Sequence, residues 1–132
     1  LHPLSYEAMA TAEEESSTSY QDLLWAWVKQ DQLRLKLLEQ MQDYPILLCP
    51  VAATPAFRHG QREWKIDGQT VTYPNNFVYS QVFNLTGNPA ATAPVSLSPE
   101  GLPIGVQIVG RHYEDAKVVA MAKQLAAALG NS

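Results

Sequence analysis

The sequence predicts an α/β fold, because segments with the periodicity of helices alternate with short apolar segments typical of strands. The clearest helices are expected at 22–42 and 114–129, and the clearest strand at 46–49. Two more strands, 93–97 and 104–109, are joined by a compact loop that contains proline and glycine. A connection of this kind would pair the two strands antiparallel.

No internal repeat or long linker divides the sequence, so residues 1–132 are predicted to form one structural unit. Residues 1–20 are expected to be a peripheral helix and a loop rich in serine and threonine. Asp22 is expected to cap the next helix or to lie in its first turn, and Pro45 ends the helical pattern. The apolar positions of this helix predict one amphipathic face, which comprises Leu24, Trp27, Val28, Leu35 and Leu38.

The continuous apolar run Ile46–Cys49 is typical of a strand that is buried on both faces. Within this run, Cys49 is interpreted as a buried small apolar residue rather than as a reactive thiol. Trp25 and Trp27 in the preceding helix are likewise interpreted as core or packing residues, with a ligand platform as the alternative.

Residues 57–73 are polar and rich in turn-forming residues, and they predict a surface excursion from the fold. Inside it, Asp67 and Gly68 separate two short segments of β-forming residues, which is a good signal for a hairpin. His59 belongs to the same segment and is interpreted as a solvated loop residue.

A shorter helix is expected after the excursion, capped by Asn75 or Asn76 and running through Phe83. Gly87 suits the left-handed backbone conformation that ends many helices, and the proline that follows it blocks continuation. Three later glycines predict a bulge or close packing rather than a ligand-binding loop, and these are Gly101, Gly105 and Gly110.

The composition argues against several classes of function. The 132 residues are 46% hydrophobic and carry a net charge of −4, without the basic stripe that nucleic-acid binding requires. No apolar run is long enough to span a membrane, so no membrane contact is expected and a cytoplasmic location is the default. The chain begins at Leu1 rather than methionine, and its apolar strands would need more sheet and helix to cover them. A fragment of a larger protein is therefore expected.

No local arrangement of residues predicts catalysis within this chain. Ser16 and Ser17 lack flanking glycines, and the sequence contains no G-x-S-x-G elbow, no H-E-x-x-H pair and no phosphate-binding glycine loop. His2 and His112 have no partners at the spacing of metal ligands, so they are interpreted, like His59, as solvated loop residues. The sequence therefore predicts a scaffold and one wall of a pocket, with no catalytic residue, no metal site and no cofactor.

Three separated blocks of the sequence closely resemble the C-terminal region of amidase-signature enzymes in order and spacing. The blocks are Phe83–Ala90 (FNLTGNPA), Ala93–Val95 (APV) and Gly101–Arg111 (GLPIGVQIVGR). Upstream, Asp43–Pro50 is similar to the family's strand and proline loop, and Glu114–Leu129 is similar to its last helix. The resemblance extends over roughly residues 20–130.

The resemblance implies an α/β/α sandwich around a large mixed sheet, of which this chain is the C-terminal fragment. It also implies hydrolysis of linear amides by a serine nucleophile, a second serine in a cis peptide and a lysine, with backbone N–H groups stabilising the oxyanion. In the family these groups lie upstream of the residues seen here, so no catalytic residue is assigned to this chain. The expected partners are the missing N-terminal catalytic part of the same protein and a small amide substrate, and a homodimer stays open.

The resemblance further implies a substrate-binding role for the helix before Asn84, where the positions seven and three residues earlier face the acyl side of the pocket. These positions are Phe77 and Gln81, an i, i+4 pair on one helical face. In the family's glutamyl-tRNA amidotransferase branch an aspartate matches Phe77 and engages the substrate's amino group. A phenylalanine there disfavours glutamine and favours an apolar or aromatic acyl group. The alternative is that Phe77 only fills the core.

Two other functions stay open from the sequence. A truncated relative that acts as a non-catalytic interaction module predicts a stable, monodisperse protein of 132 residues. An inactive amidotransferase subunit predicts a stoichiometric partner on purification. A Gly-rich segment with two serines and a lysine encoded upstream would favour the amide hydrolase instead.

Overall fold

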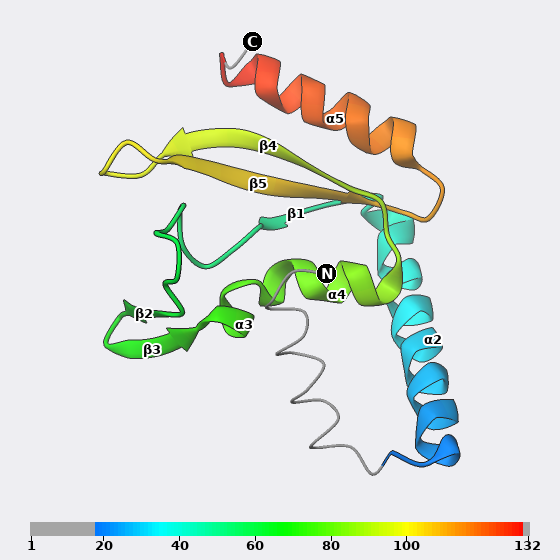
Figure 1. The fold of residues 1–132 in the computed structure, drawn as a ribbon. Coiled ribbons are helices and arrows are strands. Elements are labelled where there is room, and N and C mark those ends of the chain that lie inside the picture. The colour runs from blue at the N-terminus through cyan, green and yellow to red at the C-terminus, as the bar shows by residue number, and fades with distance from the viewer. Residues whose placement is uncertain (1–17, 131–132) are drawn as a thin grey trace. The chain divides into compact units, whose positions relative to one another are not determined.

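The computed structural model describes residues 18–130 of the chain (Figure 1). Packing divides the chain into two compact units, Leu1–Gln32 and Leu33–Ser132, and the boundary falls inside a continuous helix rather than in a linker. The peripheral helix and loop expected at 1–20 lie almost wholly outside the described residues. They stay a prediction, as does the organisation of the whole chain as a single unit.

The first described helix, α2, spans Tyr20–Asp43, close to the predicted bounds, but all five residues of its predicted apolar face are exposed. Ser19 caps it: the Ser19 hydroxyl oxygen accepts a hydrogen bond from the Asp22 backbone N–H at 3.2 Å, and an Asp22 carboxylate oxygen accepts one from the Ser19 N–H at 3.0 Å. Asp22 therefore lies in the first turn, and its pKa is lowered by the hydrogen bonds from the Ser19 side chain and backbone. No helix in the described part of the chain combines the length and apolar character needed to cross a bilayer.

The prediction that Trp25 and Trp27 are core residues is wrong. Their side chains in α2 remain 58% and 54% exposed. Helical periodicity shows that apolar residues share a face, but it does not show whether the surface that covers the face belongs to the same stretch of chain.

The main sheet has three strands in the order β1-β5-β4, where β1 is Ile46–Pro50, β4 is Ala90–Leu97 and β5 is Pro103–Gly110. Both neighbours pair antiparallel with the central β5, which confirms the predicted β4–β5 hairpin. A bulge between Pro94 and Ser96 interrupts the ladder at a residue that has no N–H to donate. All three strand pairs within residues 18–130 are antiparallel, so the mixed sheet stays a prediction for a larger protein.

Helices lie on both faces of this sheet, which confirms the predicted α/β class. Helix α5, Asp115–Ala128, packs on β4 and β5, and α4, Val78–Thr86, lies on the opposite face (Figure 1). The core lies between α5 and the sheet and comprises Ala93, Ile108 and Val118, with Ala122 and Leu125 packed against them. The helix was expected to reach residue 129, but Leu129 follows the last helical residue and is exposed.

The prediction that strand β1 is buried on both faces is wrong. Leu48 is 57% exposed and Cys49 is only half-buried. Helix α5 (Asp115–Ala128) packs mainly on the other two strands, so in the described chain it does not cover the edge strand β1. The Cys49 sulfur lies 3.4 Å from the side-chain nitrogen of Gln107 on β5.

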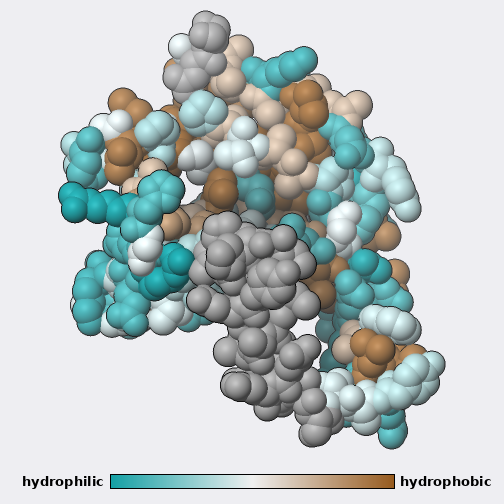
Figure 2. All heavy atoms as spheres, viewed as in Figure 1, coloured by the Kyte–Doolittle hydropathy of each residue, from teal (hydrophilic) through white to brown (hydrophobic). Residues whose placement is uncertain are grey.

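The predicted hairpin within 57–73 is confirmed as β2, Glu63–Ile66, and β3, Gln69–Thr72. Asp67 and Gly68 form its two-residue turn with φ values of 48° and 78°, as a type I′ turn requires. Figure 2 shows mainly hydrophilic residues over the hairpin, at the lower left. His59, which precedes the hairpin, is exposed as expected.

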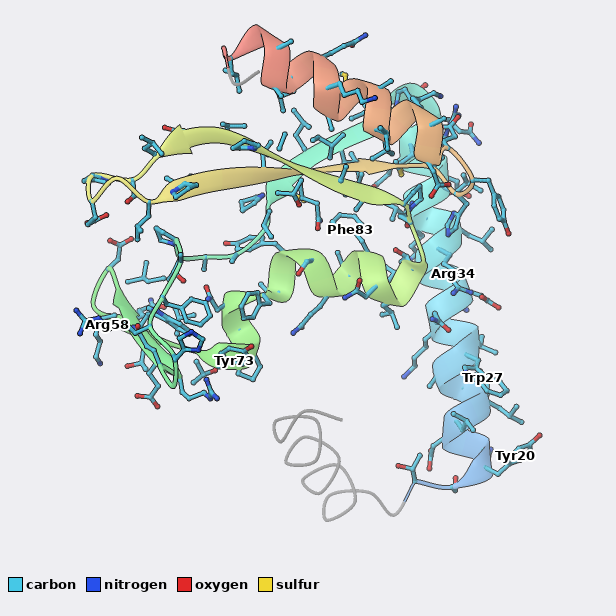
Figure 3. The ribbon with its side chains drawn as sticks, turned by 45° about the horizontal axis from the view of Figure 1, so that its top comes forward. Tyr20, Trp27, Arg34, Arg58, Tyr73 and Phe83 are labelled. Atoms are coloured by element: carbon cyan, nitrogen blue, oxygen red, sulfur yellow. The ribbon has the colours of Figure 1, made fainter. Side chains whose placement is uncertain are left out.

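The predicted short helix is present, but its cap is not where the sequence placed it. A single turn, α3 (Tyr73–Asn76), is followed by a break at Phe77 and then by α4. Asn76 is fully buried and does not cap α4. Gly87 does end α4 as expected, with φ 77° and an N–H that donates to the Phe83 carbonyl at 2.8 Å. The Phe83 ring points from α4 toward the sheet (Figure 3).

Candidate functional site

The loop after β1 is fastened to α3 by one buried asparagine. The Asn76 side-chain amide and the Thr54 hydroxyl form two contacts, of 3.0 and 3.2 Å. The Asn76 carbonyl also accepts a hydrogen bond from the Ala53 N–H at 2.9 Å. Because Asn76 is completely shielded from solvent, these bonds fix the path of residues 51–57.

Residues 51–57 form one side of a pocket of about 380 Å³. The opposite side comes from Phe77, from Thr92 on β4 and from the start of β5. The complete lining consists of Val51, Ala52, Ala53, Thr54, Pro55, Ala56, Phe57, Phe77, Thr92, Pro103, Ile104 and Gly105. The lining is thus mainly apolar. The Thr92 methyl group lies close to the Gly105 backbone, and a Cβ on residue 105 would stand 2.9 Å from that methyl carbon.

Phe77 lines this pocket, and the substrate-facing role that the resemblance implies for it stays a prediction. It sits at the break between α3 and α4 with φ −108° and ψ 13°. Its ring is half-buried against Tyr73 at 5.1 Å between ring centroids and against Phe57 at 6.2 Å. The break between the helices therefore places an aromatic side chain at the pocket rather than on a regular helical face.

Gln81 is not among the residues that line the pocket. Its backbone N–H donates to the Phe77 carbonyl at 3.2 Å, so the expected i, i+4 relation exists. However, the exposed Gln81 side chain turns back and donates to the Pro74 carbonyl at 3.2 Å. The structure therefore brings Phe77 to the pocket but leaves the Gln81 amide outside it.

A second hollow, of about 700 Å³, adjoins the first. The two share Thr54–Phe57, and the second continues along hairpin residues 63–66 to Glu100 and Leu102. Phe57 and Trp64 both line it, and their ring centroids are 4.8 Å apart in an edge-to-face arrangement. Neither residue is predicted from the sequence to belong to a site, because the polar composition of 57–73 hides an aromatic cluster.

Polar contacts join the end of α4 to α2 and to the loop after β5. The Thr86 carbonyl at the end of α4 accepts a hydrogen bond from the Arg34 guanidinium at 3.0 Å and lies 2.7 Å from His112 Nε2. His112 is half-buried here, so its interpretation as a solvated loop residue is wrong. His2 lies outside the described residues.

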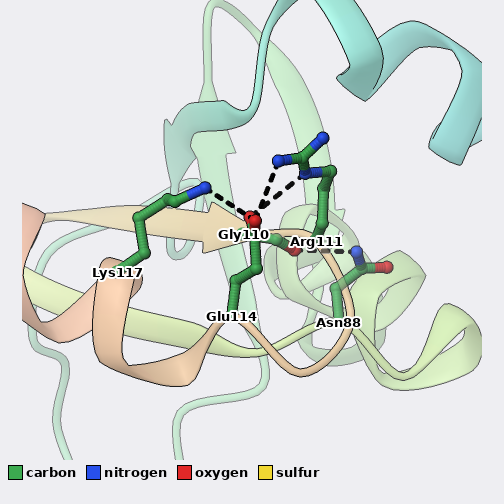
Figure 4. A network of polar contacts seen from close by, with 5 residues as sticks. All are labelled: Asn88, Gly110, Arg111, Glu114 and Lys117. Atoms are coloured by element: carbon green, nitrogen blue, oxygen red, sulfur yellow. Dashed lines mark hydrogen bonds and ion pairs between the residues drawn. The ribbon is translucent and has the colours of Figure 1, made fainter.

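A neighbouring network joins β5 to α5 (Figure 4). Asn88 donates from its side chain to the Gly110 carbonyl at 2.9 Å. Glu114 accepts hydrogen bonds from Arg111 at 2.8 and 3.1 Å and from Lys117 at 2.6 Å, which lowers the Glu114 pKa to about 2. These contacts lie around the end of β5 and the start of α5, whereas the first pocket lies at the start of β5. We therefore assign these contacts a structural role.

The first pocket has no residue that could act as a general acid or base in its lining. Its two hydroxyl residues are Thr54 and Thr92, and the Thr54 hydroxyl is bonded to Asn76. No cluster of three metal-ligating side chains occurs among residues 18–130. This pocket can hold and orient an apolar group.

Comparison with known proteins decides the family. The Amidase family profile matches residues 3–119, nearly the whole chain. The chain belongs to the amidase family. Within that family, the chain is 32% identical over 130 residues to a Mycobacterium tuberculosis protein that carries the amidase name AmiB2, and the match covers 96% of the chain. It is 36% identical over 108 residues, or 78% of the chain, to a glutamyl-tRNA(Gln) amidotransferase subunit from Acidobacterium capsulatum.

A solved amidase structure has the same fold, with a TM-score of 0.83 and 30% sequence identity over 98% of the chain. The chain spans only 29% of that amidase, 28% of the AmiB2 protein and 21% of the amidotransferase subunit. It therefore corresponds to less than a third of each of these relatives.

Proposed function

We propose that this chain forms one wall of the active site of an amide hydrolase whose catalytic residues lie in another part of the protein. The supporting observation is the pocket of about 380 Å³ at Phe77, which is apolar and has no acid, base or activated nucleophile in its lining. Amidase family membership supports the reaction class. The serine nucleophile, the second serine and the lysine expected from the resemblance would then reach this pocket from the missing part.

In this proposal the acyl group of a linear amide packs against Phe77 and residues 51–57. Apolar burial provides the binding free energy there, at about 25 cal/mol per Å². The lining contains no carboxylate that could hold a substrate ammonium group. An apolar or aromatic acyl group therefore suits the pocket better than glutamine, although one relative is an amidotransferase subunit.

Gln81 has a supporting place in this proposal. Its hydrogen bond to the Pro74 carbonyl spans the break between α3 and α4. By fixing that break, Gln81 would keep Phe77 oriented toward the pocket without touching substrate.

Phe77→Ala in the full-length protein is expected to change acyl preference more than stability. The ratio of kcat/KM for the phenylacetyl to the acetyl amide of 4-nitroaniline should fall about tenfold, because only the larger group fills the space against the ring. Steady-state kinetics with both amides and thermal unfolding provide the two readouts.

Tyr79→Ala is the matched control, because Tyr79 is an aromatic residue of α4 that does not line the pocket. Its phenylacetyl-to-acetyl ratio should stay at the wild-type value. If Phe77→Ala instead slows both amides equally, in step with a lowered melting temperature, Phe77 is only a core-filling residue.

A further inference from the structure

The two hollows are separated by one short piece of chain. Thr54–Phe57 lines both, so one hollow begins where the other ends. Across this divide the rings of Phe77, Phe57 and Trp64 follow one another, with centroid separations of 6.2 and 4.8 Å. An apolar group that passes Phe77 therefore meets Phe57 next and then Trp64.

The hairpin that carries Trp64 is held in place by these aromatic contacts. The Trp64 ring stacks on Tyr73 at 6.5 Å and contacts Phe57 edge-to-face, and the Arg62 guanidinium lies 4.9 Å from the centre of the Tyr73 ring. An isolated two-stranded hairpin is only marginally stable, so the aromatic cluster fixes the position of β2 and β3. Trp64 is thus half-buried, lines the second hollow and belongs to a hairpin whose position is fixed.

The charges around the second hollow do not favour an ion. Its lining has two cationic side chains and two carboxylates, namely Arg58, Lys65, Glu63 and Glu100. The Lys65 ammonium already donates to the Thr70 hydroxyl at 2.6 Å, and the Glu100 carboxylate accepts from the Ser98 hydroxyl at 2.7 Å. The remaining lining is mainly apolar and includes Trp64, Ile66 and Leu102. A neutral, apolar group fits this surface best.

We propose that the second hollow is a substrate subsite that takes the distal, neutral aryl or alkyl part of a long acyl group, and that Trp64 determines this specificity. The inference rests on the proposed function, because it needs the acyl group to lie in the first pocket. It adds a substrate class: amides whose acyl chain is long enough to pass Phe57 and end on Trp64. Trp64 contacts only this distal part, so it has no role in the reaction of short amides.

The test uses the full-length protein and 4-nitroanilides of acetic, hexanoic and 6-phenylhexanoic acids. In the wild-type protein kcat/KM should rise along the series. Trp64→Ala should lower kcat/KM for the 6-phenylhexanoyl amide about tenfold, mainly through KM, and change that of the acetyl amide less than about twofold. Trp64→Phe keeps an aromatic ring and should restore most of the loss.

Tyr44→Ala serves as the matched control, because Tyr44 is 71% exposed and lines neither hollow. Its selectivity should equal that of the wild type. An equal loss for all three amides in Trp64→Ala, or no loss at all, would overturn the subsite while leaving amide hydrolysis intact. Failure of the wild-type protein to hydrolyse any amide in the series would instead contradict the proposed function, and the subsite with it.

Discussion

Gly110→Ala should strongly destabilise the full-length protein. Gly110 ends β5 beneath α5, and a Cβ at this position would lie far inside van der Waals contact with a methyl group of Val118. The backbone cannot easily yield, because the Gly110 N–H donates to the Pro89 carbonyl and the Gly110 carbonyl accepts from Asn88. Overpacking of this kind costs roughly 1–3 kcal/mol, which a shift of the urea unfolding midpoint would measure.

The double variant Gly110→Ala/Val118→Ala is the control for this prediction. Removal of the Val118 methyl groups creates space for the new Cβ, so the two substitutions should destabilise the protein by less than the sum of their separate effects. Strict additivity would show that the two positions are not in the contact that the structure gives them.

Asn76→Ala should release the loop that forms the first pocket. The substitution removes both side-chain contacts to Thr54 in a fully buried position, at a cost of roughly 1–3 kcal/mol for the polar groups left unpaired. Because residues 51–57 line the pocket, the full-length variant should also lose affinity for the phenylacetyl amide. Urea unfolding and KM are the two measurements.

Asn75 provides a closely matched comparison, since it is the same residue type one position earlier but is exposed. Asn75→Ala should change stability by less than about 0.5 kcal/mol. Equal effects of the two substitutions would mean that the lost stability reflects the helical turn α3 and not the hydrogen bonds between Asn76 and Thr54.

Elements with local signals could be predicted well. The hairpin turn at Asp67-Gly68, the cap glycine Gly87 and the β4–β5 pair each depend on residues that are neighbours in sequence. The predicted close packing of Gly110 is also confirmed, since a Cβ there would clash with Val118. For the turn, the cap glycine and the strand pair, a backbone preference or a short connection determines the structure.

Features that depend on distant residues could not be predicted. Asn76 has a typical helix-capping side chain, but its partners Ala53 and Thr54 lie more than twenty residues earlier, and burial among them overrode the local preference. The aromatic cluster likewise joins Phe57, in a loop, to Trp64 in a polar hairpin. No spacing rule links such residues before the chain folds.

The remaining wrong predictions concern apolar residues that were expected to be buried. Trp27 on α2 and Leu48 on β1 were expected to be buried, yet they are 54% and 57% exposed. A chain that matches less than a third of its relatives' length can carry apolar faces that other residues cover in a longer protein. The non-catalytic interaction module predicts instead that a separate partner covers these faces.

Hydrolysis of 4-nitroanilides by the purified 132-residue chain, measured beside the same chain with the residues that the gene encodes upstream of it, tests the central proposal most directly. We predict no turnover above the uncatalysed rate by the chain alone at any pH, and turnover by the longer protein that is abolished when its upstream serines are replaced by alanine. Turnover by the 132-residue chain itself, at a rate that persists through repeated purification, would contradict the proposal that the catalytic residues lie outside it.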